Sequence, residues 1–182
     1  MQALGPDAVN TSAAQCKLFS EDVYHQGECA DFVISPENTD GLSRAVAIAA
    51  QGGISLNPRG GGMSYTKGYT PDRAGIGILD FSKMDKILEI NGEDMYVTVQ
   101  AGVTWKQLYE VLSPLGLRTP FWGPLSGIIS TIGGGVSQNN AFFGGGKYGA
   151  SSESVLSVKV VTADGTVINT GSAANQNGKP FF

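Results

Sequence analysis

The amino-acid sequence predicts an α+β fold. Short apolar runs of strand length alternate with segments of helical periodicity along most of the 182 residues. Hydrophobic residues make up 41% of the chain and aromatic residues 9%, which is enough to fill a core. Glycine is the unusual component, because 26 of the 182 residues are glycine and the ordinary share is about 7%. The fold must therefore include extended glycine-rich loops.

The first part of the chain predicts a β-α-β unit over residues 31–57. Residues 31–35 form a short apolar run, and Pro36, Asn38 and Thr39 follow it with side chains typical of a helix start. Apolar side chains then recur three and four residues apart until the helix ends at Gly52. Residues 54–57 form a second strand, and a helical crossover between two strands favours a parallel pair.

The later elements are shorter. Further strands are expected over residues 75–81, 86–91 and 94–101. Thr104 and Gln107 have the spacing of a capping box, so a helix begins there, and Gly116 ends it. Residues 117–154 have no regular period, although a short helix could lie within residues 130–140.

The last predicted element is a β-hairpin. Its two strands span residues 155–163 and 166–170. The dipeptide Asp164-Gly165 between them is typical of a two-residue turn of the primed type.

Charge and hydropathy exclude several function classes. The net charge is −4 and no block of Lys and Arg occurs, which argues against a nucleic-acid surface. No stretch approaches the roughly 18 consecutive apolar residues of a membrane-spanning helix, and the first ten residues lack the pattern of a signal peptide. We therefore expect a cytoplasmic protein without a membrane span.

A structural metal site is not expected. Cys16, Cys29 and His25 are too few to provide the four ligands of a zinc site. Cys29 is interpreted as a small buried residue before the first strand, and His25 as a surface or structural residue.

The glycines gather in two tracts. The first contains Gly60, Gly61 and Gly62 directly after a predicted strand, and the second extends over residues 116–149. Consecutive glycines allow positive φ values and can direct several backbone N–H groups at one anion, to which Arg59 and Ser64 would add donors. An isolated triple glycine is more often a tight turn, but the second tract favours backbone that closely approaches a long phosphate-containing ligand.

Standard nucleotide motifs do not account for these tracts. The P-loop pattern needs Ser or Thr after its lysine, whereas Gly68 follows Lys67 and Tyr148 follows Lys147. Residues 144–149 match GxGxxG, but no strand precedes them and no clear amphipathic helix follows, so the match is interpreted as accidental.

Five segments in order carry a resemblance to a known family. They are PRGGGMSYTKGY at 58–69, VTVQAGVTWKQL at 97–108, TPFWGPLSG at 119–127, TIGGGVSQNNAFFGGGKYG at 131–149 and VVTADGTV at 160–167. From about residue 18 to its end, the chain resembles the FAD-binding domain of the vanillyl-alcohol oxidase and p-cresol methylhydroxylase (PCMH-type) family. Within that family it is most similar to FAD-linked oxidases and dehydrogenases of the D-lactate and glycolate type.

The resemblance implies a domain organisation and a set of cofactor contacts. An N-terminal segment (1–30) would precede an incomplete FAD-binding domain of two α/β subdomains (about 31–92 and 93–182), with FAD between them. Around the FAD diphosphate would lie Arg59, Gly60, Gly61, Gly62, Met63 and Ser64. The flavin and ribityl side would be lined by Pro124, Ser126, Thr131, Ile132, Gly133 and Gly134, with Gly144, Tyr148 and Gly149 nearby. Val160 would lie close to the adenine.

The resemblance also implies a reaction. Such proteins oxidise a 2-hydroxy acid or a related alcohol by hydride transfer to flavin N5, and an aryl-alcohol or sugar oxidase is an alternative within the family. Some members attach the flavin covalently through a His in the glycine loop, where this chain has Met63, so dissociable FAD is expected. The family's cap domain, which binds the small-molecule substrate and supplies acid/base residues, has no counterpart here. A fragment that binds FAD but has no activity alone is the other alternative, and no catalytic residue is assigned.

Overall fold

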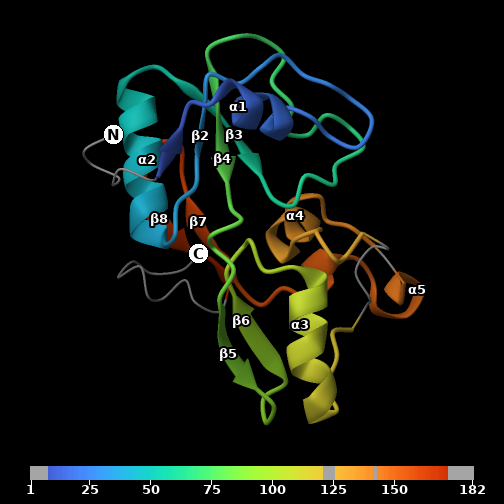
Figure 1. Ribbon diagram of the computed structural model, residues 1–182. Coiled ribbons are helices and arrows are strands. Elements are labelled where there is room, and N and C mark those ends of the chain that lie inside the picture. The colour runs from blue at the N-terminus through green and yellow to red at the C-terminus, as the bar shows by residue number, and fades with distance from the viewer. Residues whose placement is uncertain (1–7, 121–125, 142, 172–182) are drawn as a thin grey trace.

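The computed structural model describes residues 8–120, 126–141 and 143–171, and it confirms the α+β prediction (Figure 1). The main sheet has the order β1-β2-β4-β3. Its strands are β1 (Val9–Asn10), β2 (Phe32–Ile34), β4 (Ile76–Asp80) and β3 (Ser55–Arg59). β1 is antiparallel to β2, whereas β2 and β3 both run parallel to β4.

The predicted β-α-β unit forms, but its two strands are not neighbours. β4 lies between them, so that Ile78 is paired with Val33 of β2 and with Asn57 of β3. Every residue of β4 is buried, and a strand that is covered on both faces takes the centre of a parallel sheet. The connecting helix indicates that β2 and β3 run in the same direction, but it does not indicate which strands are neighbours in the sheet.

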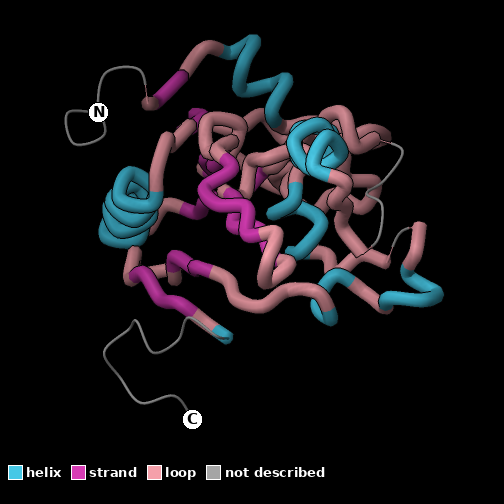
Figure 2. Tube along the Cα trace, turned by 90° about the horizontal axis from the view of Figure 1, so that it is seen from below, coloured by secondary structure: helices cyan, strands magenta, loops and turns pink. Residues whose placement is uncertain are grey.

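Helices cover both faces of this sheet. α2 (Thr39–Gln51) begins at Asn38, whose side chain accepts a hydrogen bond from Gly41 N at 2.9 Å. Leu42 and Ala45 of α2 pack with Ile34 of β2 in one buried cluster. Figure 2 views α2 and α3 nearly end-on at separate sides of the molecule.

The opposite face is covered by α1 (Ala13–Phe19). Its Cys16 packs with Val33 and Ile78, which alternate with the residues that face α2. The interpretation of Cys29 as a buried residue was wrong, because Cys29 is exposed and Cys16 is the buried cysteine. Cys29 precedes the sheet in an irregular segment, where the pattern of apolar residues does not determine burial.

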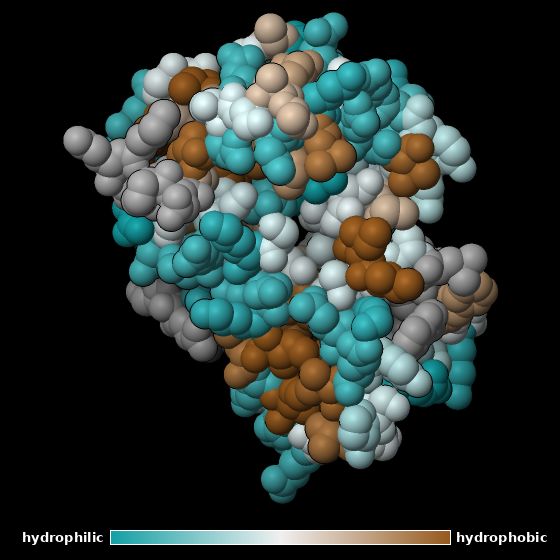
Figure 3. All heavy atoms as spheres, in the orientation of Figure 1, coloured by the Kyte–Doolittle hydropathy of each residue, from teal (hydrophilic) through white to brown (hydrophobic). Residues whose placement is uncertain are grey.

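A second group of elements forms below the main sheet in Figure 1. β5 (Ile87–Asn91) and β6 (Tyr96–Val99) pair as an antiparallel hairpin beside α3 (Trp105–Leu112), which continues into the 3-10 turn η1 (Ser113–Leu115). Val103, Leu108 and Leu112 are the centre of a separate hydrophobic cluster. Figure 3 shows apolar side chains exposed over this hairpin and α3.

The predicted capping box of α3 is confirmed. Thr104 Oγ1 accepts a hydrogen bond from Gln107 N at 3.1 Å, and Gln107 Oε1 accepts one from Thr104 N at 2.8 Å. Gly116 follows η1 with φ 70°, the left-handed conformation that ends helices.

The remaining chain forms short elements. These are α4 (Ile132–Ser137), α5 (Gly145–Tyr148), the 3-10 turn η2 (Ser151–Glu153), β7 (Lys159–Val161) and β8 (Val167–Asn169). α4 lies within the range expected for a short helix, whereas α5 was not predicted because glycine is a poor helix former. The hairpin of β7 and β8 packs on α2, where Ser43 Oγ donates to Gly165 O at 2.6 Å.

The prediction of a primed turn in this hairpin was wrong. A type I′ turn needs positive φ at both central residues, and Gly165 has φ 86° whereas Asp164 does not have a positive φ. Gly165 N donates to Thr162 O at 2.8 Å, so the turn begins one residue earlier than expected and Gly165 ends it. Asp164 instead accepts hydrogen bonds from the hydroxyl groups of Thr162 and Thr166.

The division of the chain near residue 92 stays a prediction. Packing joins β5 to β6 and α3, and it joins β7 to α2. Among the described residues, no helix has the length and apolar character needed to cross a membrane.

Candidate functional site

The two glycine tracts meet in the fold. A Cβ placed on Gly60 would clash with Oγ1 of Thr131, and one on Gly61 would clash with the carbonyl oxygen of Ile129. Thr131 and Ile129 belong to the segment that leads into α4. The absence of side chains at Gly60 and Gly61 therefore lets the loop after β3 lie directly on the second tract.

The backbone amides of the first tract are unused. The six N–H groups of residues 60–65 donate no hydrogen bond to any residue that the structure describes. Gly62 has φ 77°, which turns the chain within this run. Backbone donors without partners are rare in folded proteins unless a ligand or water satisfies them. The loop, defined here as the glycine loop (residues 60–65), is a candidate anion-binding site.

Ser64 stabilises the glycine loop from within. Its side chain is buried, and its Oγ accepts hydrogen bonds from Thr66 N at 3.2 Å and from Gly68 N at 3.3 Å. The Ser64 hydroxyl thus closes the turn that follows the loop. Met63 is half-buried beside it.

The side chain of Arg59 packs beside the glycine loop. Its guanidinium lies over the rings of Phe19 and Tyr69, at 4.4 Å and 5.4 Å from their centroids. A Cβ on Gly62 would clash with the guanidinium, so this glycine leaves room for it. Among the described residues, the buried Nε of Arg59 has no hydrogen-bond partner, and no carboxylate forms an ion pair with Arg59. Its positive charge is available to an anion at the loop.

The second tract uses its amides internally. Ile132 N donates to Val103 O at 2.8 Å, Gly133 N to Ala101 O at 2.9 Å, and Gly134 N to the side chain of the N-cap residue Thr131 at 3.2 Å. These hydrogen bonds join the start of α4 to the turn before α3. The three amides are therefore occupied, and these residues can contact a ligand by packing against it. The carbonyl of Ser126 accepts from two amides of the next turn. Pro124 lies outside the described residues.

The short helix α5 contains Tyr148 and lies between Gly144, its N-cap, and Gly149, its C-cap. Gly144 has φ 103° and Gly149 has φ 76°, so both positions favour glycine. The Tyr148 hydroxyl lies 3.5 Å from a guanidinium nitrogen of Arg118. Interaction with Lys147 and then the charge of Arg118 lower the pKa of Tyr148 below its usual range.

The structure does not bring all the expected residues into one cluster. Val160 lies in β7, which packs on α2, and Figure 1 places α5 on the opposite side of the molecule from α2. A compact ligand would not reach both places, whereas a long dinucleotide has the shape to do so.

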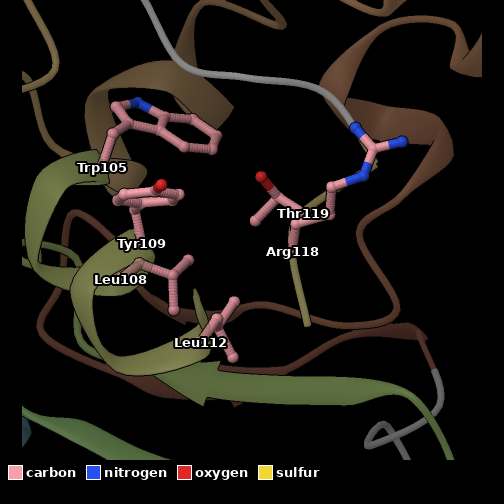
Figure 4. A pocket seen from close by; sticks show the side chains of 6 residues that line it. All are labelled: Trp105, Leu108, Tyr109, Leu112, Arg118 and Thr119. Carbon is pink, nitrogen blue, oxygen red and sulfur yellow. The ribbon is translucent and has the colours of Figure 1, made fainter. Parts of the chain in front are cut away.

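Two hollows lie outside the glycine loop. The one in Figure 4 has a volume of about 10 Å³, too small for more than about one water molecule, and is lined by Trp105, Leu108, Tyr109, Leu112, Arg118 and Thr119. The other, of about 870 Å³, is polar and lies beside β3, with Asn57, Lys67 and Thr70 in its wall. Among the described residues, no group of His, Cys, Asp and Glu has the arrangement of a metal site.

Sequence reasoning missed the residues that hold the glycine loop in place. They are Phe19 and Asp22, from one segment near the N-terminus, and Tyr69, from the segment that follows the loop. Asp22 is followed by a local turn, in which its side chain accepts from the amides of Tyr24 and His25, and an Asp before a turn is the one signal that could have indicated it. His25 is half-buried and bonded to Asp22, which agrees with its interpretation as a structural residue.

Comparison with known proteins gives a consistent result. The sequence profile of a family described as FAD binding domain matches residues 30–171. Glycolate oxidase subunit GlcD from Bacillus subtilis is 36% identical over 172 residues, which are 94% of this chain and 36% of the relative. The mitochondrial D-lactate dehydrogenase [cytochrome] of Kluyveromyces lactis is 35% identical over 145 residues, covering 77% of this chain and 24% of the relative.

The fold has close counterparts among solved structures. A p-cresol methylhydroxylase structure matches with a TM-score of 0.80 and 22% identity over 98% of this chain and 35% of the other. At this identity the likeness concerns the fold alone. The chain spans about a third of the length of the relatives it matches.

Proposed function

Because the chain belongs to the FAD binding domain family, matched over residues 30–171, we propose that its two glycine tracts hold FAD through dissociable contacts. FAD is the cofactor of this family, and relatives such as glycolate oxidase subunit GlcD are oxidoreductases. Met63 occupies the loop position of the covalently linked His in some members, and a thioether does not form that bond.

One observation supports the location of the diphosphate. The six amides of the glycine loop have no partner among the described residues. The guanidinium of Arg59 lies next to Gly62 of this loop, and no described carboxylate forms an ion pair with it. A diphosphate is the part of FAD that accepts many hydrogen bonds and carries charge. Backbone donors in a nest and a nearby arginine fit both needs.

The other contacts follow from the positions of the tracts. The expected flavin and ribityl contacts are Pro124, Ser126, Thr131, Ile132, Gly133 and Gly134. Because the amides of Ile132, Gly133 and Gly134 are already bonded, these residues would contact the flavin by packing. Gly144, Tyr148 and Gly149 would border it at α5, and Val160 would lie toward the adenine.

The parent reaction is the oxidation of a 2-hydroxy acid or a related alcohol. Relatives named for glycolate and D-lactate support this substrate class. The flavin, when bound, supplies the hydride acceptor at N5, and the residues of this chain bind and orient the cofactor. Since the chain spans about a third of its relatives, we assign substrate binding and turnover to parts of the whole protein beyond this domain.

The absorbance spectrum of the purified chain, after incubation with FAD and removal of free cofactor, tests the proposal. We expect a flavin spectrum that remains with the protein and is released into the supernatant on acid precipitation. A colourless protein would refute FAD binding. Flavin that stayed in the precipitate would refute dissociable attachment.

A further inference from the structure

Residues that precede the match of the family profile contribute directly to the glycine loop. The profile match begins at residue 30, but Asp22 bonds the segment that follows the loop, residues 66–69, which is called the arm here. The Asp22 side chain is fully buried. A buried carboxylate needs several donors to remain favourable, so its partners indicate what it holds.

The two carboxylate oxygens of Asp22 accept from different backbone amides. Oδ1 accepts from Tyr24 N at 2.9 Å and from His25 N at 2.6 Å, both within its own turn. Oδ2 accepts from Lys67 N at 2.9 Å, which lies 45 residues further along the chain. His25 Nδ1 lies within hydrogen-bond distance of both oxygens, 3.0 Å from Oδ1 and 3.2 Å from Oδ2. The carboxylate therefore shapes the local turn, and through Oδ2 it also ties that turn to the arm of the glycine loop.

Lys67 is the point where this arm needs support. Its φ is 58°, a left-handed value that costs free energy for a residue other than glycine. Two more hydrogen bonds join the same segments, from Val23 N to Ser64 O at 3.2 Å and from the Tyr69 hydroxyl to Glu21 O at 2.7 Å. These two hydrogen bonds hold the arm on both sides of Lys67. Asp22 accepts a third hydrogen bond from the backbone N–H of Lys67 itself.

We propose that Asp22 is a positioning residue that fixes the glycine loop so that the amides of residues 60–65 converge on the FAD diphosphate. This inference rests on the proposed function. It extends the cofactor site to residues 19–25, which precede the residues matched by the family profile. Burial pushes the pKa of Asp22 up, but the N–H groups of Tyr24, His25 and Lys67 outweigh burial and lower that pKa to about 2, so the group is charged at neutral pH.

If Asp22 acted only through its charge, a neutral substitution would change FAD affinity in the direction opposite to that expected for a positioning residue. Removing a negative charge near a diphosphate site strengthens anion binding by simple electrostatics. Removing the tether to Lys67 instead lets the arm leave its strained conformation and spreads the loop amides over several orientations. The sign of the change in FAD affinity therefore separates positioning from charge.

The test is Asp22→Asn with Asp31→Asn as the matched control. In Asp22→Asn the amide oxygen can still serve the local turn, whereas the NH2 group cannot accept from Lys67 N. Asp31 likewise holds a loop, accepting from Gly75 N at 3.1 Å, but that loop is not the glycine loop. FAD affinity is measured by quenching of flavin fluorescence, and the apo proteins are compared by thermal unfolding and by amide hydrogen exchange.

We expect Asp22→Asn to weaken FAD binding at least about tenfold, the effect of losing one hydrogen bond to a charged group. Asp31→Asn should stay within about twofold of wild type. Hydrogen exchange in the apo Asp22→Asn protein should rise more in residues 60–69 than in β4. Unchanged or tighter FAD binding would overturn the inference, and so would an equal rise in β4 and in residues 60–69, which indicates general destabilisation without a local effect on the loop. If the wild-type chain itself bound no FAD, the proposed function would fail instead.

Discussion

Single glycines in the glycine loop serve contacts within the protein. From the sequence alone, we expected these positions to let the backbone approach phosphate. The structure shows that the Cβ directions of Gly60, Gly61 and Gly62 point at Thr131, Ile129 and Arg59, respectively. The loop therefore needs glycine in order to contact the second tract and the arginine, and its amides have no hydrogen-bond partner in the part of the chain that the structure describes.

The substitution Gly61→Ala tests this contact. Its Cβ would clash with the carbonyl oxygen of Ile129, which is backbone and cannot rotate away. We expect a loss of about 1–3 kcal/mol in the free energy of unfolding, as for other overpacked sites, together with weaker FAD binding. Urea unfolding measures the first and fluorescence titration the second.

Gly68→Ala is the control for this experiment, because its Cβ would lie 3.4 Å from Ser64 Oγ, an ordinary contact. It should change both quantities much less than Gly61→Ala does. Equal effects of the two substitutions would show that the contact between Gly61 and Ile129 has no special importance.

Acid should remove the stabilising contribution of Asp22. The pKa of Asp22 is about 2 in the folded protein and about 3.9 in an unfolded chain. Because the folded value is the lower one, the contribution is present in full above the unfolded value and is lost as the pH falls toward 2. The difference in Tm between wild type and Asp22→Asn should therefore be largest near pH 6 and shrink toward pH 2. A difference that did not change with pH would contradict this role of the carboxylate.

Elements defined by local chemistry were predicted well. The N-cap of α2 at Asn38, the capping box of α3 at Thr104 and the left-handed end at Gly116 all form as the sequence indicates. Each depends on residues only a few positions apart. The insertion of β4 between β2 and β3 depends on pairing across the sheet, and local sequence holds no such information.

The same distinction applies to the candidate site. The glycine loop and Arg59 could be named as candidates from the sequence because they are contiguous and have a recognisable chemistry, and their contacts with a cofactor stay a prediction. Asp22 and Ile129 were not, since each meets the loop only after the chain has folded. The turn at Asp164 is a local element that was still misassigned, because its side-chain hydrogen bonds favoured a different turn from the one that Asp-Gly suggests.

The capping box can be tested in α3. Thr104→Ala removes the acceptor for Gln107 N, and we expect it to lower the free energy of unfolding by about 1 kcal/mol. Thr104→Ser keeps the hydroxyl and should restore most of the stability. Urea unfolding followed by circular dichroism measures both. If Ala and Ser were equally destabilising, packing of the Thr methyl group and not capping would explain the loss.

The whole molecule consists of two hydrophobic regions that meet at the glycine tracts. Clusters on both faces of the main sheet form one region, and the cluster of β5, β6 and α3 forms the other. The glycine loop extends from β3 of the first region, and Thr131 joins the second through its bridge to Thr104. With a net charge of −4, the protein has no general attraction for an anion, so an anionic cofactor bound as we propose would be held by local donors at this junction.

A ligand bound at the junction should stabilise both regions together. At a free FAD concentration 100 times the dissociation constant, mass action adds about 2.7 kcal/mol to the free energy of unfolding. For a chain of this size we expect Tm to rise by about 5–10 °C.

Amide hydrogen exchange should slow in α3 as well as in β4, since FAD would contact tracts attached to both regions. Riboflavin, which lacks the diphosphate, is the control and should produce a much smaller shift. Protection confined to the main sheet would show that FAD binds the glycine loop without engaging the second tract.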